Sequence, residues 1–109
     1  MASNDYFVIV YMILGYLYAC VKNGEDPDLN FYGYQAVEIN RRYWVYVVRS
    51  LRNEGYVEGV EATGSGKYSA VMVRDIQITP EGIAFLQTSP LMAKAKDALK
   101  NGKTFIPGI

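Results

Sequence analysis

The residues best suited to chemistry in this sequence of 109 residues lie on one face of the segment at positions 41–54. At about 100° per residue, a helix over these positions gathers three arginines, a tyrosine and an asparagine on one side. These residues are Arg42, Tyr46, Arg49, Arg52 and Asn53, with Arg41 at the edge of the group. Guanidinium and amide groups on one helix face are suited to contact phosphates and base edges in the major groove of DNA.

This arginine-bearing face predicts a nucleic-acid interface. We expect Arg42 and Tyr46, near the start of the helix, to lie closest to the bases. Arg49 and Arg52 then meet phosphates, and Lys67, from a glycine-rich turn, reaches the neighbouring backbone. The alternative is that these polar residues only solvate the surface of the helix. In that case the arginines pair with nearby acids, namely Glu38, Glu54, Glu58 and Glu61.

The overall charge restricts how DNA can be bound. The chain has 11 lysines and arginines against 11 aspartates and glutamates, so its formal net charge is zero. Association with DNA is driven largely by neutralisation of phosphates, so a neutral protein needs a locally concentrated basic patch. A continuous patch joining Arg42, Arg49, Arg52, Lys67 and Arg74 favours DNA, whereas acids among them, such as Glu58 and Glu61, favour a protein partner.

Several enzyme classes are excluded by composition. The chain has no histidine, so a Ser-His-Asp triad, a Cys-His pair and a histidine-ligated metal are impossible. Its one cysteine, Cys20, allows neither an intrachain disulfide nor a structural zinc cluster, and we expect it to be a small buried hydrophobe. No paired-carboxylate motif is present. We therefore predict that the protein is not an enzyme and has no catalytic residue, cofactor or metal.

Two segments resemble ligand-binding loops but lack residues that those loops require. Asp26, Asp28 and Asn30 resemble the start of a calcium loop, but the sixth position, which requires glycine, is Phe31, and the twelfth, which requires glutamate, is Val37. The segment 64–67, Gly-Ser-Gly-Lys, lacks the first glycine and the final Ser or Thr of a phosphate loop. We expect turns at both places.

The elements that position the arginine face have clear boundaries. Asn40 is a candidate N-cap for the helix, and Gly55 closes it. The apolar side of the same wheel is expected to face the core and consists of Trp44, Val47, Val48 and Leu51.

A hairpin follows this helix directly. Positions 56–61 alternate in polarity, positions 64–66 are a glycine turn, and positions 68–78 form a second strand. Asp75 interrupts the alternation, which predicts a bulge or kink nearby. Two strands around a glycine loop, placed directly after a helix, are typical of a wing.

The first segment, residues 6–21, has no charge. It is shorter than the roughly 20 residues of a membrane span, and no positive region precedes it as a lipoprotein signal requires. We therefore expect a core helix with Asn4 or Asp5 as its N-cap and Gly24 as its C-terminal stop, in a cytoplasmic protein without a membrane partner. Because a small domain has little mass to cover such a helix, we predict a homodimer through Val8, Tyr11, Met12 and Tyr16, aided by the C-terminal tail at positions 104–109.

Two helices are predicted after the hairpin. Thr79 and Pro80 form a typical helix start, and Ser89 and Pro90 repeat it. The second of these helices covers positions 91–100 and ends at Gly102.

The order of elements is that of a winged helix, and two stretches resemble the YjcQ-like proteins of bacteria and phages. The stretches are positions 51–60 and positions 78–87, the latter continued by 89–100. This resemblance implies a winged-helix fold without an established activity. We predict an α+β protein, a winged helix-turn-helix with a two-stranded wing and additional C-terminal helices, as one domain over 1–109. The expected function is that of a DNA-binding transcriptional regulator of bacterial or phage origin, and the alternative is a protein–protein interaction module on the same scaffold.

Overall fold

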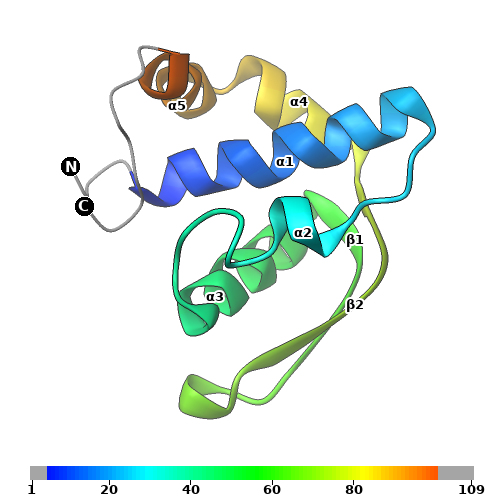
Figure 1. The fold of residues 1–109 in the computed structure, drawn as a ribbon, viewed down its shortest axis with the longest axis vertical. Coiled ribbons are helices and arrows are strands. Elements are labelled where there is room, and N and C mark those ends of the chain that lie inside the picture. The colour runs from blue at the N-terminus through cyan, green and yellow to red at the C-terminus, as the bar shows by residue number, and fades with distance from the viewer. Residues whose placement is uncertain (1–4, 101–109) are drawn as a thin grey trace.

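The computed structural model describes residues 5–100 and has an α+β architecture (Figure 1). Its helices are α1 (Asp5–Asn23), α2 (Leu29–Tyr32), α3 (Arg41–Asn53), α4 (Pro80–Thr88) and α5 (Pro90–Lys100). Its strands are β1 (Val57–Thr63) and β2 (Ala70–Ile78), which form an antiparallel two-stranded sheet. A single turn of 3-10 helix, η2 (Gly66–Tyr68), lies at the tip of the hairpin.

Helix α1 is the central element of the molecule. It lies between α4 and α5 on one side and α2, α3 and the hairpin on the other (Figure 1). Its apolar side chains supply much of the core, and no residue at positions 6–20 is exposed. Cys20 is a free thiol buried at the end of this run, which confirms its predicted place.

The predicted dimer interface on α1 requires correction. Val8 is completely buried within its own chain, and Tyr11, Met12 and Tyr16 are half-buried against the same core. We expected too little protein to cover α1, but α4 and α5 fold back over it. Val8 therefore cannot contact a second copy, and the homodimer stays a prediction. The C-terminal tail lies outside the described residues.

One stretch in the described part of the chain, Tyr6–Asn23, is long and apolar enough to cross a membrane by length and composition. A core helix of a soluble protein passes the same test. The packing of both of its sides against other elements of the chain accounts for its apolar composition here.

The start of α3 and its core face are confirmed, and the helix ends at Asn53, one residue before the predicted end. The Asn40 side chain accepts a hydrogen bond of 2.8 Å from the backbone N–H of Tyr43, and Gly55 follows the helix with a φ of 81°. The indole N–H of Trp44 donates a hydrogen bond of 2.9 Å to the backbone carbonyl of Tyr32, and this bond ties α2 to α3. The predicted core residues are all buried, namely Trp44, Val47, Val48 and Leu51.

The hairpin is confirmed, with one irregularity and shifted strand boundaries, since β1 covers Val57–Thr63 where positions 56–61 were predicted. Val57 pairs with Ile78 and Thr63 with Ala70, and the register shifts at Gly59. Asp75, opposite this shift, has a φ of 50°, so the kink predicted near it is present. The second strand begins at Ala70 rather than at position 68, because positions 66–68 are wound into η2.

The two final helices begin where predicted. The Thr79 hydroxyl accepts a hydrogen bond of 3.0 Å from the N–H of Gly82, and the Ser89 hydroxyl accepts one of 3.1 Å from the N–H of Leu91. At the other end of the chain, α1 begins at Asp5 and Gly24 follows its last residue with a φ of 68°. The predicted cap Asn4 and the predicted stop Gly102 lie outside the described residues.

A buried phenol makes the stability of this fold sensitive to alkaline pH. Burial raises the pKa of Tyr32 to about 12, with smaller contributions from Tyr16 and Asp28. Because the folded protein holds this proton more tightly than the unfolded chain, the stabilisation is fully present below pH of about 10 and is lost as the pH rises toward 12. We expect wild type to lose about 2 kcal/mol more than Tyr32→Phe over this interval. Denaturant titrations at stepped pH measure the difference, and equal losses in the two proteins would contradict it.

Candidate nucleic-acid interface

A cleft of about 390 Å³ separates α3 from the tip of the hairpin. Both elements lie on the same side of α1, with the tip close to the start of α3 (Figure 1). Four of the six predicted site residues line this cleft, namely Arg42, Tyr46, Arg49 and Asn53. The structure therefore brings together most of the residues that the helical wheel selected.

The hairpin tip supplies the other wall of the cleft. Ser65, Gly66 and Ser69 line it, and Ser50 of α3 joins them. The helical wheel and the turn signal did not select these three serines, although Ser65 lies within the glycine turn, Ser69 follows it, and serine hydroxyl groups suit phosphate contacts. Lys67 is exposed in the same tip, with Nζ 5.4 Å from the ring centroid of Tyr68, but it does not line the cleft.

The predicted solvent face is divided by the hairpin. Arg49 Nη1 donates to the carbonyl of Thr63 at 3.1 Å, and Arg52 Nε donates to the carbonyl of Val60 at 2.9 Å. Val45, which falls between these arginines on the wheel, is only 3% exposed. We expected one continuous polar face because a wheel of α3 alone does not show where β1 and β2 lie.

Arg49 and Arg52 therefore anchor the hairpin to α3 in addition to carrying charge. Arg52 Nη1 also donates to Oδ1 of Asn53 at 3.1 Å. These hydrogen bonds end on carbonyl and amide oxygens, not on the acids Glu58 or Glu61 considered in the alternative interpretation. Arg42 and Tyr46, by contrast, are exposed, and Tyr46 has 61% of its surface open.

A second tyrosine, Tyr6, packs against Tyr46, which lines the cleft. The ring of Tyr6 lies 6.2 Å from that of Tyr46, and its hydroxyl forms a hydrogen bond with Ser50. Burial raises the pKa of Tyr6, whereas the Ser50 hydrogen bond acts in the opposite direction. Tyr6 is therefore a neutral support for the wall of the cleft at ordinary pH.

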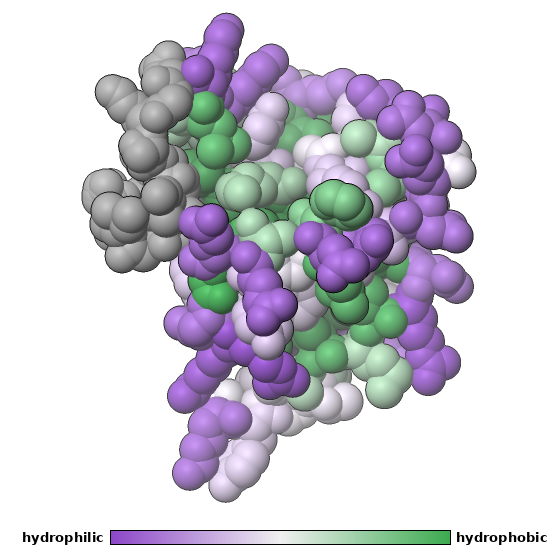
Figure 2. Space-filling model, viewed as in Figure 1, coloured by the Kyte–Doolittle hydropathy of each residue, from purple (hydrophilic) through white to green (hydrophobic). Residues whose placement is uncertain are grey.

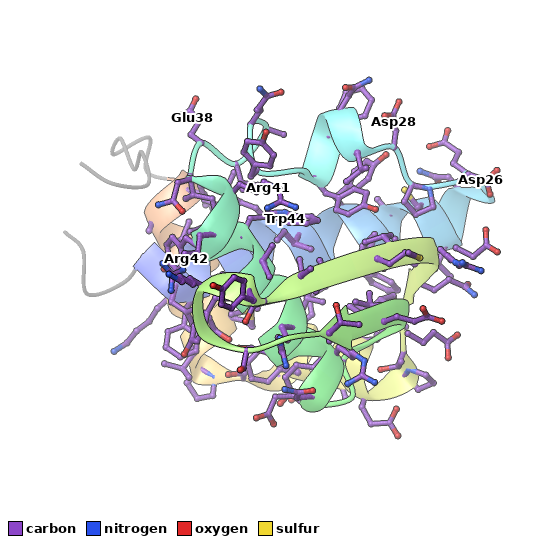
Figure 3. The ribbon with its side chains drawn as sticks, turned by 90° about the horizontal axis from the view of Figure 1, so that it is seen from below. Asp26, Asp28, Glu38, Arg41, Arg42 and Trp44 are labelled. Carbon is purple, nitrogen blue, oxygen red and sulfur yellow. The ribbon has the colours of Figure 1, made fainter. Side chains whose placement is uncertain are left out.

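Among the described residues, acids are absent from the walls of the cleft, although Glu58 and Glu61 are exposed on β1, the strand whose carbonyls hold Arg49 and Arg52. The first turn of α3 also contains no acid. Four acids instead line a groove between the C-terminal end of α1 and β2, namely Glu25, Asp26, Asp28 and Asp75. Figure 3 shows Asp26 and Asp28 at the opposite end of the molecule from Arg42.

Hydrophilic residues lie over α3 and along the edge at the α1–α2 connection, with apolar residues between them, and the hairpin tip is mostly of intermediate hydropathy (Figure 2). Within residues 5–100 no group of three or more His, Cys, Asp or Glu side chains is placed to hold a metal ion.

A family model described as YjcQ protein matches residues 11–105. The chain belongs to the YjcQ family. The match includes α3, the hairpin and both final helices, and it confirms the resemblance noted at positions 51–60 and 78–87. No curated protein matches the chain, and no solved structure matches it. Membership of the YjcQ family carries no activity with it, so the function must be inferred from the site.

Proposed function

We propose that this YjcQ protein is a winged-helix DNA-binding protein that regulates transcription. The order α1, α2, α3 and hairpin is that of a winged helix-turn-helix, in which α3 enters the major groove and the hairpin contacts the flanking backbone. The observation that carries the proposal is the carboxylate-free cleft, because it places two arginines of α3 beside the serine-rich hairpin tip.

We assign different DNA contacts to these residues. Arg42 and Tyr46 lie in the first half of α3 and are exposed, so they are placed to reach base edges. Lys67, exposed at the tip, is assigned a contact with a neighbouring phosphate. Arg49 and Arg52 hold the hairpin against α3 and add positive charge to the same surface.

The absence of acids among the described residues that line the cleft supports DNA binding by a protein whose net charge is zero. Electrostatic attraction acts over about 10 Å at 0.1 M salt, so a phosphate near α3 responds to the arginines there more than to acids at the far end of the molecule. A basic patch on a neutral protein can therefore bind DNA, with an affinity that depends steeply on salt.

Titration of the wild-type chain with generic duplex DNA tests the proposal. We expect measurable binding at about 50 mM salt and a slope of about −3 for the logarithm of the binding constant against the logarithm of salt, one unit for each of about three cations. If no binding is measurable at about 50 mM salt, where attraction is strong, the DNA-binding proposal is wrong.

A protein–protein interaction module is the second candidate. It is favoured by large apolar side chains that the fold leaves open on α2, where Leu29 is 52% exposed and Phe31 is 63% exposed. These residues lie away from the arginine-lined cleft. Failure to bind DNA at low salt would leave this surface as the better supported functional site.

A further inference from the structure

A second cleft, of about 340 Å³, lies between α2, the turn that follows it, and β2. It is distinct from the cleft at the hairpin tip, and the two share no lining residue. Sites for small molecules are typically concavities of about 300–1,000 Å³ with mostly apolar walls and a few placed polar groups. The volume and walls of this second cleft meet that description.

The floor of the second cleft is apolar and held in place. Trp44 and Val45 come from α3 and are 7% and 3% exposed, and Val71 and Val73 come from β2. The hydrogen bond from the indole N–H of Trp44 to the carbonyl of Tyr32 fixes the orientation of the ring. An apolar group entering the cleft therefore meets a preformed surface.

Arg41 lines the same cleft and is the one charged residue among its walls. It is exposed, and no hydrogen bond or ion pair ties its guanidinium to another residue in the described part of the chain. Figure 3 shows the side chain of Arg41 beside Trp44, while Glu38 points away from both and Arg42 leaves the helix in another direction. The guanidinium is thus available to a ligand.

We propose that the second cleft binds a small molecule that combines an apolar body with a carboxylate. The body packs on Trp44 and the valines of β2, and the carboxylate accepts hydrogen bonds from Arg41, whose planar fork matches it. The ligand contacts α3 and β2 together, and of these two elements only α3 also lines the cleft at the hairpin tip. This site does not depend on DNA binding and is tested without DNA.

Trp44 provides the measurement, because it is the only tryptophan in the chain. Its emission is followed while the wild-type protein is titrated with phenylacetate and, separately, with phenylacetamide, which has the same apolar body without the charge. We expect a saturable change in Trp44 emission with phenylacetate. Phenylacetamide is expected to bind about fivefold more weakly, because a single exposed ion pair strengthens binding by about that factor. No saturable change with phenylacetate, or equal affinity for the two compounds, would overturn the proposal.

Two matched variants separate Arg41 from general charge. Arg41→Gln and Arg42→Gln each remove one positive charge from the first turn of α3, but only Arg41 lines the cleft. Arg41→Gln is expected to bind phenylacetate no better than phenylacetamide, and Arg42→Gln to keep the wild-type preference. Equal loss of preference in both variants would show a diffuse electrostatic effect and contradict the assigned role of Arg41. Thermal melts confirm that both variants are folded before the titrations are compared.

Discussion

Replacing Gly82 by alanine is expected to lower the free energy of unfolding by about 3 kcal/mol and the melting temperature by about 12 °C. Gly82 is buried in the first turn of α4, where a Cβ would overlap the carbonyl oxygen of Tyr56 and lie 2.8 Å from Cγ1 of Ile78. That carbonyl also accepts the N–H of Thr79 at 3.0 Å, so the strand end and the helix cap cannot separate without losing a hydrogen bond.

Gly15 is the matched control for Gly82. It lies inside α1, and a Cβ built there meets no atom within 4 Å outside the helix itself and its neighbours in the chain. Alanine favours the helix over glycine by about 0.8–1.0 kcal/mol, so Gly15→Ala is expected to raise the melting temperature by about 3 °C. Calorimetry or circular dichroism on the three proteins measures both shifts. A Gly82→Ala variant that melts within a degree or two of wild type would contradict the close packing of α4 on Tyr56.

The double variant Arg42→Ala, Lys67→Ala is expected to bind duplex DNA about thirtyfold more weakly than wild type at about 50 mM salt. Each lost phosphate contact also lowers the salt slope by about one, so a reduction by one or by two shows whether one or both of the side chains meet phosphate. These residues are chosen because both are exposed, whereas Arg49 and Arg52 also hold the hairpin and their removal would alter the fold.

The control for this prediction removes the same charge elsewhere. Lys94 and Lys96 are exposed on α5, which lies across α1 from α3 and the hairpin (Figure 1). The variant Lys94→Ala, Lys96→Ala is expected to retain wild-type affinity within about twofold. Equal weakening by the two double variants, measured by fluorescence anisotropy across a salt series, would place the DNA elsewhere or show only non-specific attraction.

Much of the fold and part of the candidate site were predictable from local patterns. Asn40 and Thr79 act as the caps that their positions predict, and the four core residues of α3 are buried as its wheel indicates. The helical period of about 3.6 residues per turn likewise sufficed to select the residues of the arginine face. Their division into exposed and anchoring members was not predictable, because it depends on β1, whose carbonyls at Val60 and Thr63 accept the arginine hydrogen bonds.

By itself the sequence determined the order of the elements, their caps and turns, the apolar sides of the helices and the arginine face. All of these depend on neighbours within about one helical turn or one hairpin, where local geometry is decisive. Only the tertiary structure decided that α4 and α5 cover α1, that Gly82 lies against Tyr56, and that Trp44 and Arg41 border a cleft. These outcomes arise from contacts between segments far apart in the chain, which neither the composition nor the period of any one segment specifies.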